Sequence, residues 1–220
     1  MKGDKVGPAC AQKCDEPCDE AKSSEDCLYL NVFVPNRAID LNDKVPVSIW
    51  IHGGAFRWGQ GGSILYDGRV VAGQADHIII TLNYRLSAFG FFYKGFIESD
   101  QTNDGNWGFL DQQMAIKWVK ENIAGFNGDP DRITVYGESA GAISSIQHVI
   151  NKESRKHFNS AIIQSNPLAI PFKEAWEATI QGTESLQIFN LSSYKETFLP
   201  RRLDVPHLTW HVCGRNQREI

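Results

Sequence analysis

The chain lacks any apolar run that approaches the roughly 20 residues needed to cross a bilayer, so no membrane span is predicted. It also lacks a basic run, since 26 acidic residues outnumber 22 basic ones and the formal net charge is −4. That balance argues against nucleic acid and against an anionic membrane surface as partners. Residues 1–5 are not followed by an apolar segment, so they do not match the pattern of a secretory signal peptide.

Cysteine is scarce outside the first 27 residues, where four of the five cysteines gather: Cys10, Cys14, Cys18 and Cys27. Such a cluster predicts disulfides and an oxidising compartment, so we expect the complete protein to be extracellular or in the secretory pathway. A structural zinc site is the alternative, although the paired knuckles typical of zinc sites are absent. Four cysteines allow three pairings, and the spacing does not choose among them.

Short apolar runs predict the strands of a mainly parallel sheet. Several of them barely alternate, which is typical of strands buried on both faces. The expected strands are residues 28–34, 47–51, 78–82, 133–136 and 159–164, with a turn at residues 128–131. Helices are expected at residues 111–123 and from about 140 to 149. This alternation of strands and helices predicts an α/β fold with both faces of the sheet covered.

The segment Gly137-Glu138-Ser139-Ala140-Gly141 matches the G-x-S-x-G pattern of a nucleophile elbow. It lies between an expected strand and an expected helix, as that motif requires. The turn is too tight for bulky neighbours, so glycines flank the serine and its oxygen projects above the sheet. The N-terminus of the following helix also favours developing negative charge. The pattern therefore predicts Ser139 as a nucleophile.

A second glycine-rich segment, His52-Gly53-Gly54-Ala55-Phe56, directly follows the expected strand at residues 47–51. A loop in that place can direct backbone N–H groups at an oxyanion. Alone, the segment would be equally compatible with an ordinary glycine turn. Its position upstream of a well-placed elbow favours the oxyanion interpretation.

Together with several further motifs, these segments resemble the type-B carboxylesterases and cholinesterases. The further motifs are residues 24–32, Asn83-Tyr84-Arg85, residues 105–112, residues 126–130 and Ile163-Gln164-Ser165. The resemblance covers about residues 8–178 and implies an α/β-hydrolase fold, in which a mainly parallel sheet is flanked by helices. We therefore expect a partial α/β-hydrolase domain at residues 1–178. Residues 179–220 show no clear helical or strand period and are expected to be a divergent tail.

The resemblance also implies a function: a carboxylic ester hydrolase that forms an acyl-enzyme on a small-molecule ester and needs no metal or cofactor. Ser139 matches the nucleophile, while Gly54, Ala55 and Ala140 match the backbone donors of the oxyanion hole. Cys10 and Cys27 match a family disulfide, in which case Cys14 and Cys18 would pair with each other. Residues 11–26 contain no aromatic residue, whereas cholinesterases hold the substrate cation with a tryptophan there, so choline esters are disfavoured.

The family's triad follows the order serine, acid, histidine, and both partners of the serine lie far downstream. Neither is expected within residues 140–220, so we predict that this chain is incomplete at both ends and has little activity of its own. Its four histidines after the serine are expected to be packing or surface residues: His148, His157, His207 and His211. A catalytically inactive adhesion or binding protein is the alternative, but such relatives commonly lose the serine. The oligomeric state is left open.

Overall fold

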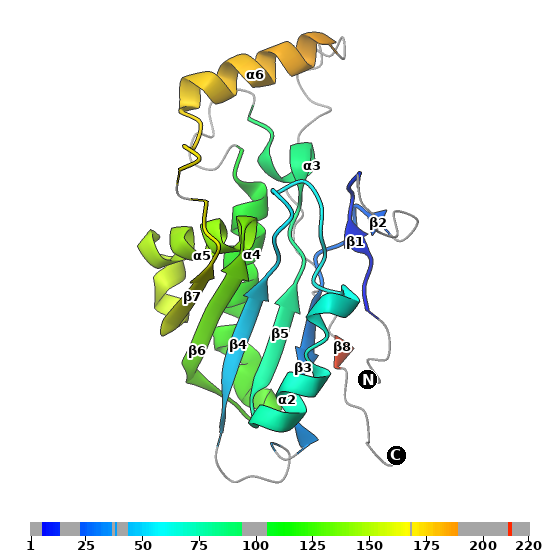
Figure 1. Cartoon of the computed structure of the whole chain (residues 1–220), viewed down its shortest axis with the longest axis vertical. Coiled ribbons are helices and arrows are strands. Elements are labelled where there is room, and N and C mark those ends of the chain that lie inside the picture. Colours follow the sequence, from blue (N-terminus) through cyan, green and yellow to red (C-terminus); the bar gives the residue numbers. More distant parts are fainter. Residues whose placement is uncertain are drawn as a thin grey trace.

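A computed structural model describes residues 6–13, 23–36, 38, 44–93, 105–167, 169–188 and 211–212, and the structural statements below concern that part of the chain. Its centre is a six-stranded sheet in the order β7-β6-β4-β5-β3-β8 (Figure 1). The strands are β3 (Leu30–Phe33), β4 (Val45–Ile51), β5 (Ile78–Leu82), β6 (Gly128–Glu138), β7 (Ser160–Gln164) and β8 (His211–Val212). Neighbouring strands are parallel except for the antiparallel pair β3 and β5, so the mainly parallel sheet is confirmed.

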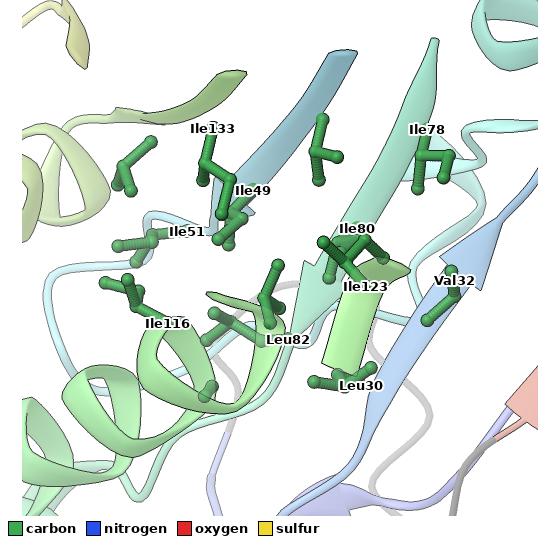
Figure 2. Close-up of a cluster of buried hydrophobic side chains, with 14 of the residues drawn as sticks. Leu30, Val32, Ile49, Ile51, Ile78, Ile80, Leu82, Ile116, Ile123 and Ile133 are labelled. Carbon is green, nitrogen blue, oxygen red and sulfur yellow. The ribbon is translucent and has the colours of Figure 1, made fainter. Parts of the chain in front are cut away.

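Helices cover both faces of this sheet (Figure 1). Alternate strand residues such as Ile49, Ile80 and Ile133 form the main core with Ile116 of α4 (Trp107–Asn122), as Figure 2 shows. The opposite face is thinner, and there Ile79 packs with Phe33 and with Ala72 of α2 (Arg69–Ala75). Every residue of β5 is buried, because both of its faces are covered.

Three further helices lie around the sheet's carboxyl end and its flank. These are α3 (Ser87–Phe91), α5 (Ala140–Ile150) and α6 (Ala175–Ile188). Short 3₁₀ helices occur at η2 (Ile64–Tyr66), η3 (Ile123–Phe126) and η4 (Ser154–His157). None of the helices in the described ranges is long and apolar enough to span a membrane.

The predicted strands and helices are confirmed, with shifted ends. The turn predicted at residues 128–131 lies within β6, at an irregularity in its register with β4. The reversal falls at Asn127, which has a φ of 61°, and Gly128 already pairs with Val45. The next pair is Val47 with Ile133, so residues 129–132 bulge out of the ladder between the two pairs. Within the bulge the Asp131 N–H donates to Asp129 Oδ1 at 2.9 Å, which is a local turn bond.

A helix forms over the first ten residues of the segment 179–220, although the sequence shows no clear helical or strand period there. Helix α6 continues through that point to Ile188. Most of its side chains are exposed and only Gly182 is buried, so its sequence carries no apolar stripe that would reveal a helix. The division of the chain at residues 178 and 179 itself stays a prediction.

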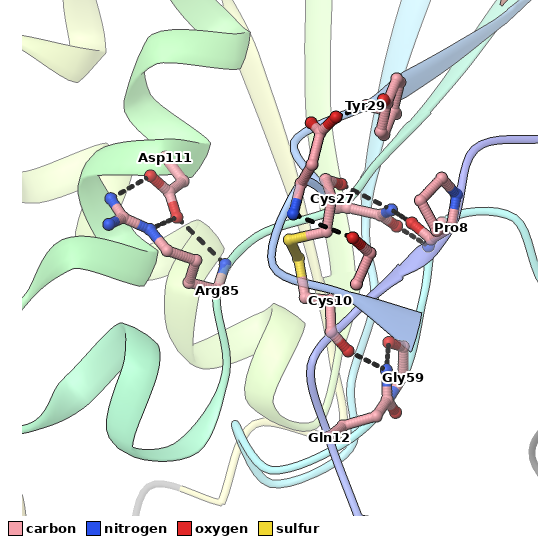
Figure 3. The surroundings of a disulfide bond; sticks show 12 residues. Pro8, Cys10, Gln12, Cys27, Tyr29, Gly59, Arg85 and Asp111 are labelled. Atoms are coloured by element: carbon pink, nitrogen blue, oxygen red, sulfur yellow. Dashed lines mark hydrogen bonds and ion pairs between the residues drawn. A yellow bond between two sulfur atoms is a disulfide. The ribbon is translucent and has the colours of Figure 1, made fainter. Parts of the chain in front are cut away.

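A disulfide joins Cys10 to Cys27 beside the sheet, with a Cα–Cα distance of 4.7 Å (Figure 3). It closes the small parallel pair of β1 (Ala9–Cys10) and β2 (Ser23–Ser24). The predicted Cys10–Cys27 pairing is therefore present. Cys14 and Cys18 lie outside the described residues.

Candidate active site

Ser139 stands on a sharp turn between β6 and α5. Its backbone has φ 55° and ψ −118°, a conformation that residues other than glycine rarely adopt. Residue 139 therefore occupies the strained strand-to-helix turn that defines a nucleophile elbow. The Ser139 N–H donates to the Gln164 carbonyl at 3.1 Å, which ties the turn to the end of β7.

The elbow needs its two glycines because other backbone atoms approach them closely. A Cβ at Gly141 would overlap the Ile51 carbonyl oxygen. One at Gly137 would lie 2.5 Å from the Gly141 carbonyl carbon and 2.8 Å from the same Ile51 oxygen. Contacts below 3.0 Å are not tolerated, so these positions admit only glycine unless the backbone moves. The G-x-S-x-G spacing thus follows from packing between the elbow and β4.

The glycine-rich loop lies directly beside the elbow, since β4 and β6 are adjacent parallel strands and Ile51 pairs with Gly137. Gly53 faces Ser139 so closely that a Cβ on it would lie 3.4 Å from the Ser139 Cβ. The same Cβ would lie 2.9 Å from the Glu138 carbonyl oxygen. The structure therefore brings the two predicted halves of the site together at one end of the sheet.

The backbone of this loop is unusual at consecutive residues. Gly54 has φ +102° and Ala55 has φ 52°. The Gly54 carbonyl accepts hydrogen bonds from the N–H groups of Arg57 and Trp58, at 2.9 and 3.1 Å. Because C=O and N–H point in opposite directions in a trans peptide, this pair of bonds turns the Ala55 N–H away from residues 57 and 58.

The start of α5 supplies further N–H groups. The first hydrogen bond of the helical pattern runs from the Ile143 N–H to the Ser139 carbonyl, at 3.0 Å. The N–H groups of Ala140, Gly141 and Ala142 precede it, so they have no partner within the helix. The positive end of the helix dipole lies at the same place.

His52 is fully buried at the base of the loop, where its ring stacks on Tyr84 with a centroid separation of 4.4 Å. Its Nδ1 lies 2.8 Å from the Gly53 carbonyl oxygen. Burial lowers the pKa of His52 to about 4, although the bond to Gly53 acts in the opposite direction. His52 is therefore neutral near pH 7.

His148 is buried within α5 and belongs to a polar network rather than to the elbow. Its Nε2 lies 3.0 Å from Gln112 Oε1 and its Nδ1 lies 2.9 Å from Ser154 Oγ. Its ring stacks on Phe109. Desolvation lowers the pKa of His148 to about 3. The packing role predicted for this histidine is confirmed.

Of the other histidines predicted to have no catalytic role, only His157 has a described side chain. His157 is half-buried in η4, and burial lowers its pKa. His207 lies outside the described residues, and for His211 only the backbone is described, in β8. Among the described histidine side chains, none hydrogen-bonds to Ser139.

An ion pair that the sequence motifs did not reveal fixes the segment after β5. Arg85 Nε and Nη2 donate to Oδ2 and Oδ1 of Asp111, at 2.8 and 2.7 Å, and the Arg85 N–H donates to Oδ2 at 3.0 Å (Figure 3). Both side chains are largely buried, with exposures of 13% and 6%. Arg85 lies in the motif at residues 83–85 and Asp111 in the motif at residues 105–112. Their opposite charges were the only signal in the sequence that could have predicted this ion pair.

A cavity of about 1030 Å³ opens next to the glycine-rich loop. Its lining includes Ala55 and Phe56 of the loop, Phe109 of α4, Ile143 of α5 and Gly182 of α6. Apolar side chains dominate this lining, as is usual for sites that bind small organic molecules. Ser139 borders the loop but is not among the lining residues. Within the part of the chain that the structure describes, no cluster of His, Cys, Asp and Glu could hold a metal ion.

Comparison with solved structures identifies the fold. A thermophilic PNB esterase superposes with a TM-score of 0.76 at 40% sequence identity, over 86% of this chain and 38% of that chain. Another PNB esterase gives 0.73 at 41% identity. The chain thus has the α/β-hydrolase fold.

Sequence comparison agrees. The model of the carboxylesterase family matches residues 1–193, and the chain belongs to that family. It is 42% identical over 171 residues to para-nitrobenzyl esterase of Bacillus subtilis (strain 168), which is 78% of this chain and 34% of that protein. It is 44% identical over 174 residues to the crystal protein of Dictyostelium discoideum, covering 78% of this chain and 30% of that protein. The chain thus spans about a third of the length of these relatives.

Proposed function

We propose that this chain carries the nucleophile and the oxyanion hole of a carboxylic ester hydrolase that works through an acyl-enzyme. The observation that carries the proposal is the contact between the strained Ser139 turn and the loop at Gly53. Family membership supports the same reaction class. A small-molecule carboxylic ester is the proposed substrate.

Ser139 Oγ attacks the ester carbonyl carbon, and the carbonyl oxygen takes up negative charge in the tetrahedral intermediate. The N–H groups of Gly54, Ala55 and Ala140 donate hydrogen bonds to that oxygen. Donors fixed in advance need no reorganisation during the reaction, and removal of one typically costs about 10²–10³-fold in rate. Collapse of the intermediate expels the alcohol and leaves the acyl group on Ser139.

The mechanism also requires a general base for the Ser139 hydroxyl proton. His52 does not supply it, because burial lowers its pKa to about 4 and leaves the ring a poor base. His148 does not supply it either, because both of its ring nitrogens are hydrogen-bonded within α5 and its neighbours. We propose that the 220-residue chain alone therefore turns over esters poorly. We propose an extracellular or secretory-pathway location, which the Cys10–Cys27 disulfide supports.

Chemical rescue tests this function directly. The chain is incubated with p-nitrophenyl acetate and excess imidazole, which supplies a base from solution, and acetylated residues are identified by peptide mass spectrometry. Ser139 should be acetylated faster than exposed serines such as Ser87, and unfolding in urea should abolish the preference. Acetylation spread over exposed lysines and serines with no preference for Ser139 would contradict the proposal.

A further inference from the structure

The buried ring of His52 has one nitrogen bonded and one without a partner. Nδ1 lies 2.8 Å from the carbonyl oxygen of Gly53, whereas Nε2 is buried and has no hydrogen-bond partner among the described residues. A carbonyl oxygen only accepts hydrogen bonds, so Nδ1 must carry the proton of that bond. Because burial keeps the ring neutral, with a pKa of about 4, Nε2 then carries the lone pair.

The bond to Gly53 has a geometrical consequence for the next residue. The peptide between Gly53 and Gly54 is planar and trans, as no cis peptide bond occurs in the described chain. Its N–H, which belongs to Gly54, therefore points opposite to the Gly53 carbonyl that His52 holds. The carbonyl is drawn toward the buried ring, and the N–H is turned away from it.

Several contacts prevent the ring from moving. Tyr84 stacks on it at an interplanar angle of 19°, and the Tyr84 hydroxyl donates to the His52 carbonyl at 2.9 Å. Gly59 packs against the ring edge so closely that a Cβ at this residue would collide with Nδ1. Gly59 also has a φ of +116°, so this close approach depends on glycine.

We propose that His52 is a positioning residue, whose Nδ1–H holds the Gly53 carbonyl and so directs the Gly54 N–H into the oxyanion hole. This role rests on the proposed function, since it concerns the orientation of one of its donors. His52 transfers no proton and touches no substrate. The bond from His52 restricts the Gly53–Gly54 peptide, which would otherwise be flexible, to one orientation.

The first test is spectroscopic and does not depend on activity. Two-bond ¹H–¹⁵N correlation spectra of the labelled full chain at pH 7 distinguish the two neutral tautomers of a histidine. His52 should show a protonated Nδ1 and an unprotonated Nε2. The opposite tautomer would overturn the proposal, because an unprotonated Nδ1 cannot donate to Gly53.

The second test uses a matched pair of variants in the imidazole-rescued acetylation of Ser139. His52→Asn keeps an N–H donor near the position of Nδ1, whereas His52→Phe keeps an aromatic ring on Tyr84 but has no donor. We expect the Phe variant to be acetylated about tenfold more slowly, less than the loss of a whole donor. The Asn variant should stay within about threefold of the unmodified chain.

The outcomes separate this inference from the proposed function. Equal acetylation rates in the Phe variant and the unmodified chain would overturn the positioning role. So would equal losses in the Asn and Phe variants, which indicate packing alone. If Ser139 of the unmodified chain is not acetylated preferentially, the proposed function fails. The tautomer measurement still decides whether His52 Nδ1 donates to the Gly53 carbonyl.

Discussion

Gln12 holds both backbone polar atoms of Gly59. Its Oε1 accepts from the Gly59 N–H at 2.7 Å, and its Nε2 donates to the Gly59 carbonyl at 2.9 Å (Figure 3). The same Nε2 lies 2.9 Å from the Cys10 carbonyl oxygen. Since Gly59 packs against His52, the Gln12 side chain links the disulfide-bonded segment to the glycine-rich loop.

Gln12→Glu should therefore destabilise the chain. A carboxylate cannot donate, so the two carbonyl oxygens lose their donor and face a negative charge instead. We expect a loss of about 1–3 kcal/mol in the free energy of unfolding. Urea denaturation measures it, with Gln74→Glu on the exposed surface of α2 as the matched control. Equal midpoints for the two variants would show that the Gln12 contacts contribute nothing.

Removing a charge from the buried Arg85–Asp111 pair should cost far more stability than removing one from the exposed Lys117–Glu121 pair of α4. Asp111→Asn leaves the Arg85 guanidinium largely buried without a countercharge, which typically costs about 3–5 kcal/mol. Glu121→Gln removes an exposed partner that lies 3.8 Å from Lys117, and about 0.5 kcal/mol or less is expected. Thermal or urea unfolding of both variants makes the comparison. A cost for Asp111→Asn no larger than that for Glu121→Gln would contradict the structural role of the pair.

The strands were predictable where burial dictates composition. Strand β5 consists of Ile78–Leu82, as predicted, because both faces are covered and only apolar or β-branched residues fit. The start of β6 was not predictable, since pairing of Gly128 with Val45 connects residues far apart in sequence. Helix α6 was missed because its exposed surface imposes no pattern.

Some parts of the candidate site were likewise predictable from the sequence, and others were not. The elbow and the loop carry local glycine patterns, which the tight turn and the close approach of β4 require. Gln12 carries no such signal, because its partner Gly59 lies 47 positions away and any side chain could occupy residue 12 in an isolated segment. The Nδ1–Gly53 bond of His52 likewise depends on the ring being trapped by Tyr84.

Stability should fall with acidification because of His148. Its pKa is lowered to about 3 in the folded chain, against an ordinary value of 6.5, so the unfolded state binds more protons between these values. The contribution is fully present above pH 6.5 and is lost as pH falls toward 3, by about 1.4 kcal/mol per pH unit. Buried His52 acts in the same direction down to about pH 4.

Urea midpoints at pH 7 and pH 5 test this dependence. The slope is compared between the unmodified chain and His148→Gln, so a constant loss of stability in the variant does not matter. The variant should lose less stability between the two pH values, by about 2 kcal/mol. Identical slopes would mean that His148 takes up its proton in the folded state without penalty.

The last prediction concerns catalysis by the 220-residue chain. Without added imidazole, it should hydrolyse p-nitrophenyl acetate little better than buffer and no faster than Ser139→Ala. A serine hydroxyl is a weak nucleophile until a base removes its proton. Burial lowers the pKa of His52 to about 4, which makes it a poor base, His77 Nε2 lies 2.7 Å from Ser48 Oγ, and both nitrogens of His148 are bonded within its network. Loss of the base in serine hydrolases costs on the order of 10⁴-fold or more.

The Ser139→Ala chain is the control, and both proteins must be monodisperse so that aggregates do not account for the difference. Turnover that disappears in Ser139→Ala would contradict the prediction, because it would require a base within reach of the Ser139 hydroxyl. Repeating the assay with His157→Gln, His207→Gln and His211→Gln would then identify that base. His148→Gln should leave any such activity in place, since the His148 ring is fully engaged by Gln112 and Ser154.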